Sequence, residues 1–332
     1  MRPASLSAGM GAGVLAVLAL ALTACGASAQ STRASAACAG AAPGVLARAA
    51  GQVATRIYAG EVAGTETRSD RRQIETNGAL LRALAAGRRE ALTRAVTTLV
   101  FSHTHIVRLR IARGSTVLAD VGGPFILAPV SGRLRLGGRT IGRYVFSVQD
   151  DLGYIKLESR FVGAPMVIRA GSRQIPVEGQ LPSAPRSIPS RGPVQVAGVR
   201  YEAFSFAGAA FPSGPLRISL LVPVPPGLAG KSCASIRSDE LGRVARRISR
   251  RFSLSPANLP VYVKLAASLT GGLLYVRSGS RQLAGSTRPG PPRLPDSGSV
   301  SYRGASYTVY SFLAPSTVGR VRVYQLSRAA AP

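Results

Sequence analysis

Along this chain the spacing of hydrophobic residues changes from a helical period to a strand period. An apolar stripe at helical spacing predicts a helix over residues 45–58, carried by Val45, Ala49, Val53 and Ile57. A second stripe predicts helix over residues 78–98. Gly87 lies inside this second stripe, and glycine is unfavourable by about 1 kcal/mol in a helix interior. We therefore expect two helices with a break at Gly87.

After His105 the apolar positions recur every second residue, which is typical of strands. The first such run predicts a hairpin over residues 107–120 that turns at Gly114-Ser115. The second predicts a hairpin over residues 133–148 that turns at Gly137-Gly138. The apolar positions of both hairpins fall on one sheet face, which we expect to pack on the helices: Val107, Leu109, Ile111, Tyr144, Phe146 and Val148.

The second half of the chain contains an internal repeat. Residues 154–175 align without gaps on residues 262–283, and residues 198–206 align on residues 304–312. Identical pairs include Tyr154/Tyr262, Lys156/Lys264, Gly163/Gly271 and Arg169/Arg277. Each copy predicts a short helix, a hairpin turning at Gly-Ser, a proline-rich segment and a final hairpin. Residues 77–150 have the same predicted order of elements and are expected to form a third, diverged copy.

Helices that precede antiparallel sheets predict an α+β fold, and the long alternation of a parallel α/β protein is missing. After a leader over residues 1–24, the small and polar residues 25–42 are expected to form a flexible tether. Helices and the first sheet follow over residues 43–150. The second and third modules cover residues 151–226 and 233–328.

The first 24 residues have the pattern of a secretory signal, with Arg2, an apolar run over 11–22 and the small pair Thr23-Ala24. The apolar run is too short to span a bilayer. Cys25 follows directly and resembles the lipobox cysteine of bacterial lipoproteins. The resemblance implies an acylated N-terminal Cys25 and a location on the extracytoplasmic face of the cell membrane. The alternative is an ordinary secretory signal that ends near a cysteine.

Two further cysteines, Cys38 and Cys233, form an even pair in a chain expected to reach an oxidising compartment. Each precedes a predicted helix, and we expect one disulfide between them. Two separate buried thiols are the alternative. Because Cys-His spacing typical of zinc sites is missing, we expect no metal, and we expect no cofactor.

The formal charge is +28, with 42 basic and 14 acidic residues, but only three of the basic residues are lysine. The excess of Arg, Ala and Gly indicates a GC-rich genome, and no basic run is interleaved with stacking aromatics. We therefore expect no nucleic acid partner, and instead nonspecific attraction to anionic head groups or cell-wall polymers. Enzyme motifs such as Gly-x-Ser-x-Gly, His-Glu-x-x-His or a phosphate-binding loop are missing, so catalysis is not expected.

The polar face of the first sheet is the candidate ligand site. Guanidinium groups bind carboxylates, and an aspartate can receive an ammonium group. We therefore expect a small carboxylate or amino-acid ligand at Arg108, Arg110, Ser147, Gln149, Asp150 and Asp151. The alternatives are exposed strand residues that face water, and an Asp150-Asp151 pair that only starts the next helix. His103 and His105 are expected to be capping or surface residues.

Residues 78–151 resemble the Cache family of extracytoplasmic sensor domains. The resemblance is carried by Asn77–Leu84, by His105–Ile111 with its Gly114-Ser115 turn, and by Ser147–Tyr154. It implies a PAS-like sheet preceded by a long helix and a sensory or ligand-binding, non-catalytic function. Such domains usually precede a membrane helix that leads to a kinase or chemoreceptor. No second apolar span follows here, so a signal would pass to a separate protein.

Two other functions are compatible with these patterns. A structural envelope lipoprotein would use its repeats to bind a cell-wall polymer or a neighbouring protein. The solute-binding component of an importer is disfavoured, because two α/β lobes with a hinge are not evident.

Overall fold

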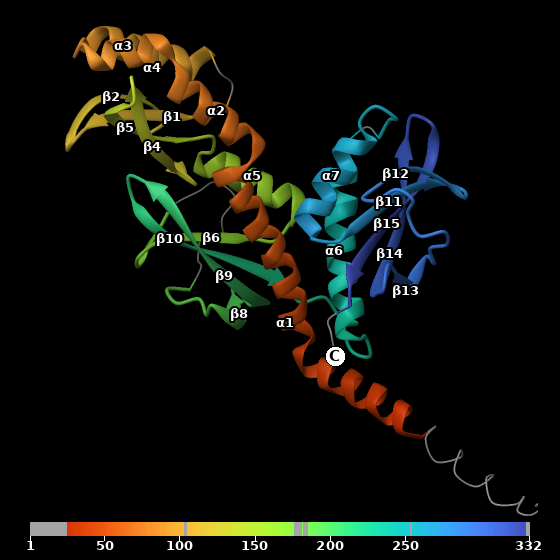
Figure 1. Ribbon diagram of the computed structural model, residues 1–332. Helices are drawn as coiled ribbons and strands as arrows, with labels where there is room; N and C mark the ends of the chain where they lie inside the picture. Colours follow the sequence, from red (N-terminus) through yellow and green to blue (C-terminus); the bar gives the residue numbers. More distant parts are fainter. Residues whose placement is uncertain (1–24, 103–104, 176–180, 182–184, 253, 330–332) are drawn as a thin grey trace, which may run out of the picture.

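The computed structural model describes residues 25–102, 105–175, 181, 185–252 and 254–329 (Figure 1). The predicted leader over residues 1–24 and His103 lie outside these residues. The described residues form three antiparallel sheets with helices against them, so the predicted α+β class is confirmed. None of the described helices is both long and apolar enough to cross a lipid bilayer.

The first module is a four-stranded sheet in the order β2-β1-β5-β4, covered on one face by helices. Its elements are α2 (Thr65–Thr76), α3 (Gly78–Ala85), α4 (Arg89–Ser102), β1 (Arg108–Arg113), β2 (Thr116–Gly122), β4 (Val130–Leu136) and β5 (Arg139–Ser147). The break at Gly87 and both predicted hairpin turns are confirmed. Leu109, Ile111, Tyr144 and Phe146 are buried against the helices, as their spacing predicts.

The second and third modules have one arrangement of helices and strands in common. The second contains α5 (Asp151–Phe161), β6 (Met166–Ala170), β7 (Arg173–Gln174), β8 (Arg191–Val196), β9 (Val199–Phe211) and β10 (Gly214–Pro223). The third contains α7 (Leu259–Thr270), β11 (Leu273–Ser278), β12 (Arg281–Gly285), β13 (Ser297–Tyr302), β14 (Ala305–Ser316) and β15 (Gly319–Arg328). Their strand orders, β7-β6-β10-β9-β8 and β12-β11-β15-β14-β13, are equivalent. The first sheet has the same order without the last strand.

The repeat also includes two longer helices, α1 (Cys25–Ala63) and α6 (Cys233–Ser249). Residues 51–57, GQVATRI, match residues 242–248, GRVARRI, at five of seven positions. A Cβ atom on Gly51 would lie 2.1 Å from the Phe204 ring, and one on Gly242 would lie 2.0 Å from the Tyr310 ring. Phe204 and Tyr310 are themselves equivalent in the repeat, so each helix packs on its own sheet in the same way.

Each long helix also caps the short helix of the other copy. Arg56 on α1 donates a hydrogen bond of 2.9 Å to the Leu269 carbonyl at the end of α7. Its repeat equivalent on α6, Arg247, donates to the Val162 carbonyl at the end of α5. Cationic side chains near a helix C-terminus satisfy its free carbonyls and interact favourably with the helix dipole. The two copies are therefore related by an approximate twofold arrangement around α1 and α6, which contact each other.

The glycine after each short helix ends that helix and makes room for the capping arginine. Gly163 and Gly271 have φ values of +70° and +67°, the left-handed conformation that commonly ends a helix. A Cβ atom at Gly163 would overlap the guanidinium of Arg247, and one at Gly271 would overlap that of Arg56. Glycine is required at both positions for the turn and for the close approach of the arginine.

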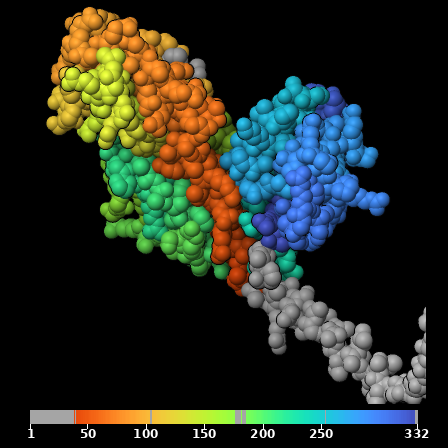
Figure 2. All heavy atoms as spheres, viewed as in Figure 1, coloured from red at the N-terminus to blue at the C-terminus, as the bar shows by residue number. Residues whose placement is uncertain are grey.

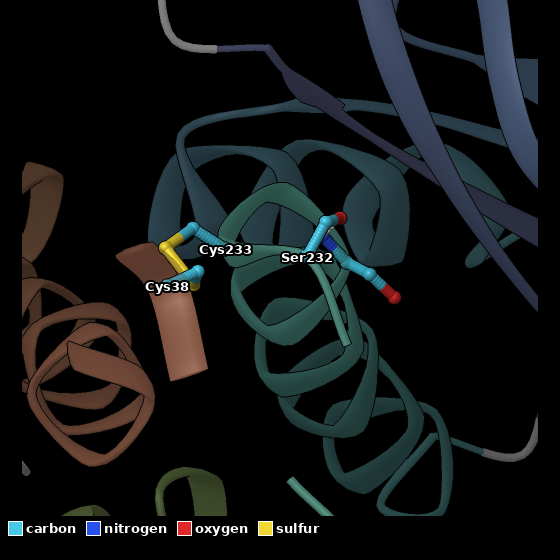
Figure 3. The surroundings of a disulfide bond; sticks show 4 residues. Cys38, Ser232 and Cys233 are labelled. Atoms are coloured by element: carbon cyan, nitrogen blue, oxygen red, sulfur yellow. Dashed lines mark hydrogen bonds between the residues drawn. A yellow bond between two sulfur atoms is a disulfide. The ribbon is translucent and has the colours of Figure 1, made fainter. Parts of the chain in front are cut away.

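Cys38 and Cys233 form a disulfide, as predicted, with a Cα–Cα distance of 5.5 Å (Figure 3). It joins α1 to the first turn of α6, where Ser232 caps the helix by accepting a hydrogen bond from the Ser235 amide. The alternative of two separate thiols does not hold. The cross-link covers 195 residues of sequence and ties the second module to the third.

Two boundaries differ from the expectations. Residues 25–42, expected as a flexible tether, are part of helix α1. Residues 43–63, assigned to the first module, bury Leu46, Val53 and Ile57 in the core shared by the second and third modules. Helix α1 therefore starts the second module, and the first module, over residues 64–150, is inserted between α1 and α5. The space-filling view shows α1 running between two lobes (Figure 2).

Candidate functional site

The candidate ligand face is centred on two arginines that share one carboxylate. Arg108 donates from Nε and Nη2 to the two oxygens of Asp120, each at 2.8 Å. Arg110 donates to Asp120 Oδ2 from Nε at 2.8 Å and from Nη2 at 2.6 Å. Arg108 Nη1 also donates to the Pro124 carbonyl. The cluster contains two positive charges and one negative charge, so it retains a net positive charge.

The pKa of Asp120 shows how strongly the arginines hold it. Partial burial alone would raise this pKa, but the hydrogen bonds and charges of Arg108 and Arg110 outweigh burial and place it below its ordinary value. The hydrogen bonds to Asp120 in turn raise the pKa of Arg108. Asp120 is therefore ionised at neutral pH.

The cluster lies where the first and second modules meet. Phe211 lies at the end of β9. The centroid of its ring is 4.3 Å from the guanidinium carbon of Arg110 and 5.1 Å from that of Arg108. Beside it, the short strand β3 (Ile126–Leu127) of the first module pairs with β9 at Phe211 and Ala210. An aromatic ring over a guanidinium is attractive by about 0.5–2 kcal/mol. The second module thus forms one wall of the arginine site.

A groove of about 720 Å³ opens beside this cluster on the outer face of the first sheet. Of the two arginines, the side chain of Arg110 is 28% exposed and that of Arg108 is 11% exposed, so Arg110 is the better placed to meet a ligand. The groove is lined by Arg110, Ala112, Ser115, Val117, Ser131, Gly132, Arg133, Arg143, Tyr144, Val145 and Phe211.

Arg133 and Arg143 are functional candidates that the sequence analysis missed. They lie directly opposite each other on β4 and β5, both exposed. Within the described residues neither is paired with a carboxylate. Like charges directly opposite on neighbouring strands destabilise a sheet. An anion between the two guanidinium groups would remove that repulsion. Their spacing around the Gly137-Gly138 turn was the sequence signal that could have predicted this pairing.

The remaining predicted site residues, at the end of β5, are bonded within the protein. Ser147 is fully buried, and its hydroxyl donates to the Leu127 carbonyl. Asp150 accepts a hydrogen bond of 2.6 Å from the Gly153 amide and caps α5. Asp151 lies in the first turn of α5. The Gln149 carbonyl accepts a hydrogen bond from the Leu127 amide. Ser147, Gln149 and Asp150 connect the modules and lie outside the groove lining.

The predictions for His105 and for a metal site concern residues outside the groove. His105 is half-exposed, and its Nδ1 lies 3.8 Å from a carboxylate oxygen of Glu66. In the part of the chain that the structure describes, no three His, Cys, Asp or Glu side chains are grouped to hold a metal ion.

No family model matches the chain, and no curated protein matches it. Among solved structures, the chain is similar to the ligand-binding domain of the Pseudomonas aeruginosa PAO1 amino acid chemoreceptor PctC in complex with GABA. Identity is 14%, the match covers 51% of this chain and 99% of that one, and the TM-score is 0.26. The periplasmic domain of Vibrio cholerae LuxQ matches at 8% identity over 88% of this chain and 100% of its own, with a TM-score of 0.16.

A third similar structure is methyl-accepting chemotaxis protein X, at 10% identity over 79% of this chain and 96% of its own, with a TM-score of 0.14. Similarities of this size assign neither a family nor a ligand to the chain.

Proposed function

We propose that this protein is an extracytoplasmic, membrane-anchored ligand-binding protein with a sensory, non-catalytic function. The anchor is a lipid on Cys25, and the resemblances to lipoproteins and to Cache domains both favour this location. The ligand is a small carboxylate or amino acid that binds in the groove on the first sheet. One observation carries the proposal: Arg110, Arg133 and Arg143 line the same groove, and within the described residues Asp120 is the single carboxylate bonded to any of them.

Guanidinium groups suit this ligand because they donate two parallel hydrogen bonds to a carboxylate. Arg133 and Arg143 already lie opposite each other, so a carboxylate between them needs little rearrangement of the sheet. Asp120, which is bonded to the groove residue Arg110, would receive the ammonium group of an amino acid. The apolar part of the ligand would contact Val117, Val145 and Phe211.

A sensory function is supported by the origin of the groove walls. Most of the lining belongs to the first module, but Phe211 comes from the second. A ligand that contacts Arg110 and Phe211 binds both modules and favours the arrangement in which they lie closest. A change in this arrangement could pass along α1, α5 and β3 to a separate signalling protein.

The test is a thermal-shift screen of the protein against amino acids and small organic acids, repeated with Arg110→Ala and Arg143→Ala. Arg72→Ala is the matched control, since Arg72 is an exposed arginine on α2 of the same module and lies outside the groove. We expect a saturable rise in Tm that both groove variants lose and the control retains. A flat response of the wild-type protein to the whole panel would favour the structural envelope protein instead.

A further inference from the structure

We propose that Glu158, with the charge of Glu61 acting on it, binds a proton at the junction of α1, α5 and the first module, and that release of this proton opens the junction. The proposal does not depend on the anchor or on the ligand of the first sheet. It is based on a comparison of the two internal copies, one of which contains these carboxyl groups and the other of which does not.

Glu158 is a buried carboxyl with an incomplete set of partners. The residue is 1% exposed and lies on the face of α5 that packs into the core. Its Oε1 accepts a hydrogen bond of 2.8 Å from the hydroxyl of Tyr154, which is also fully buried. Its Oε2 is buried without a hydrogen-bond partner. An ionised carboxylate in this position would be strongly disfavoured, because one oxygen has no donor at all.

The third module shows that the fold does not need a carboxyl here. The repeat equivalent of Glu158 is Ala266, a fully buried alanine on α7. There the equivalent tyrosine, Tyr262, donates instead to the Ala245 carbonyl at 3.1 Å. The second module thus redirects the tyrosine hydroxyl from a backbone carbonyl to a carboxyl oxygen.

The surroundings of the tyrosine also differ between the copies. Extended past the end of α6 at Ser249, the sequence register that matches α1 with α6 aligns Glu61 with Phe252. Phe252 packs against Tyr262 with the ring centroids 6.0 Å apart. In the second module the tyrosine packs against Tyr58, with centroids 5.9 Å apart, and Glu61 acts on Tyr154 and Glu158 through its charge. At the helix position of Ala266 the second module therefore has a carboxyl group, and a second carboxyl group, Glu61, acts on it through its charge.

The charged and titratable groups around Glu158 come from three helices. Tyr154 from α5 bonds it, Tyr58 from α1 packs on that tyrosine, and the charge of Glu61 from α1 acts on both Tyr154 and Glu158. Arg247 from α6 is held by the Val162 carbonyl, and Lys156 and Arg160 of α5 are exposed. Within the described residues, Glu158 forms no ion pair with any of these cations.

These surroundings determine whether the junction opens more easily at high or at low pH. Burial raises the pKa of Glu158 from 4.5 to about 8; the Tyr154 hydrogen bond opposes the rise and the Glu61 charge adds to it. Burial also raises the pKa of Glu61. In the closed junction Glu158 keeps its proton up to about pH 8, whereas in an open, hydrated junction it loses it near 4.5. Opening therefore releases a proton between these limits and becomes easier as pH rises.

The junction connects this site to the first module. The side chain of Gln149, in the segment between β5 and α5, acts on the Glu61 carboxyl and opposes the rise that burial causes in its pKa. The carbonyl of Gln149 also accepts a hydrogen bond from the amide of Leu127, the last residue of β3. Opening at Glu61 and Glu158 thus loosens the contact through which β3 pairs with β9.

Hydrogen exchange measured peptide by peptide tests the proposal, with α7 as an internal control for α5. Protection factors, corrected for intrinsic exchange, are measured from pH 5 to pH 9. For α5 we expect protection to fall by up to tenfold per pH unit to about pH 8 and then level off. For α7 we expect no such fall.

Glu158→Gln keeps the shape of the side chain but cannot titrate, and we expect its α5 protection to be independent of pH over this range. Glu158→Ala supplies the residue that the third module carries at this position and serves if the amide variant folds poorly. Equal pH dependence of α5 and α7 in the wild-type protein would overturn the proposal. So would a pH-dependent fall that persists in both variants.

Discussion

Arg169 and Arg277 occupy equivalent positions in the two repeats, and each guanidinium binds two carbonyl oxygens of its own proline-rich segment. Arg169 donates to the Pro185 and Arg186 carbonyls, and Arg277 donates to the Pro291 and Pro292 carbonyls. Both side chains are buried, and in both the Nε has no partner. The two arginines fix the segment that covers the outer face of each sheet.

This role predicts a large effect for a small change. Lysine retains the charge at position 277 but lacks the planar fork that reaches both carbonyls. We expect Arg277→Lys to lower the free energy of unfolding by about 1–3 kcal/mol, the loss for buried polar groups left without a partner. Urea denaturation measures the change. Arg281→Lys, at an exposed position on β12, is the control and should lie within about 0.5 kcal/mol of wild type. Equal values for the two variants would show that Arg277 does not hold the segment.

The packing of the long helices predicts opposite results for three glycines. An alanine methyl group at Gly51 or Gly242 would overlap the ring of Phe204 or Tyr310. We expect Gly51→Ala and Gly242→Ala each to destabilise by about 1–3 kcal/mol through overpacking. Gly60 in α1 has open space around it, and Gly60→Ala should stabilise by about 0.5–1 kcal/mol. The same denaturation assay ranks the three, and a stabilising Gly51→Ala would contradict the close approach of α1 to β9.

The disulfide predicts a redox-dependent stability. In the chain-entropy model, a cross-link over 195 residues stabilises by about 5 kcal/mol. We expect the double variant Cys38→Ala, Cys233→Ala to lose a stability of this order, and a reducing agent to have the same effect on wild type. Cys25→Ser is the control and should respond to the reducing agent as wild type does. Insensitivity of the wild-type protein to reduction would mean that the two halves are held by packing alone.

Asp120 predicts an acid-sensitive first module. Its pKa is lowered in the folded protein, so its pairing with Arg108 and Arg110 stabilises the fold above the ordinary value of 3.8. That contribution is lost as the pH falls through the lowered value. We expect Asp120→Asn to destabilise the first module at pH 7 and to have a smaller effect at a pH well below 3.8. Limited proteolysis at both pH values measures this. Asp296→Asn, a variant of an exposed ion pair with Arg322, should change little.

The elements of the sheets could be predicted from the sequence because their signals are local. Alternating residues defined the strands, glycine pairs defined the turns, and identical residues aligned the two copies. The assignment of α1 to the second module could not be predicted in this way. Its spacing showed an apolar face but not which sheet would cover it, and residues 64–150 separate the helix from the rest of its own copy.

The predicted ligand face stays a prediction, and only the placement of its residues can be compared with the structure. Arg108 and Arg110 do lie on one face, but their pairing with Asp120 depends on a register shift between Ile111 and Ala112. A second register shift, between Leu134 and Arg135, lies between the Gly137-Gly138 turn and the Arg133–Arg143 pair. It therefore determines which residue of β5 lies opposite Arg133. A one-residue slip changes the face on which a side chain lies, and bulges of this kind leave little trace in the sequence.

The proposed anchor at Cys25 is tested most directly by the mass of the N-terminal peptide of the protein isolated from its own membrane. The account predicts a polypeptide that begins at Cys25 and carries a diacylglyceryl group on the sulfur. A native chain that still begins at Met1 with a free Cys25 thiol, or that is recovered from the cytosol, would contradict it.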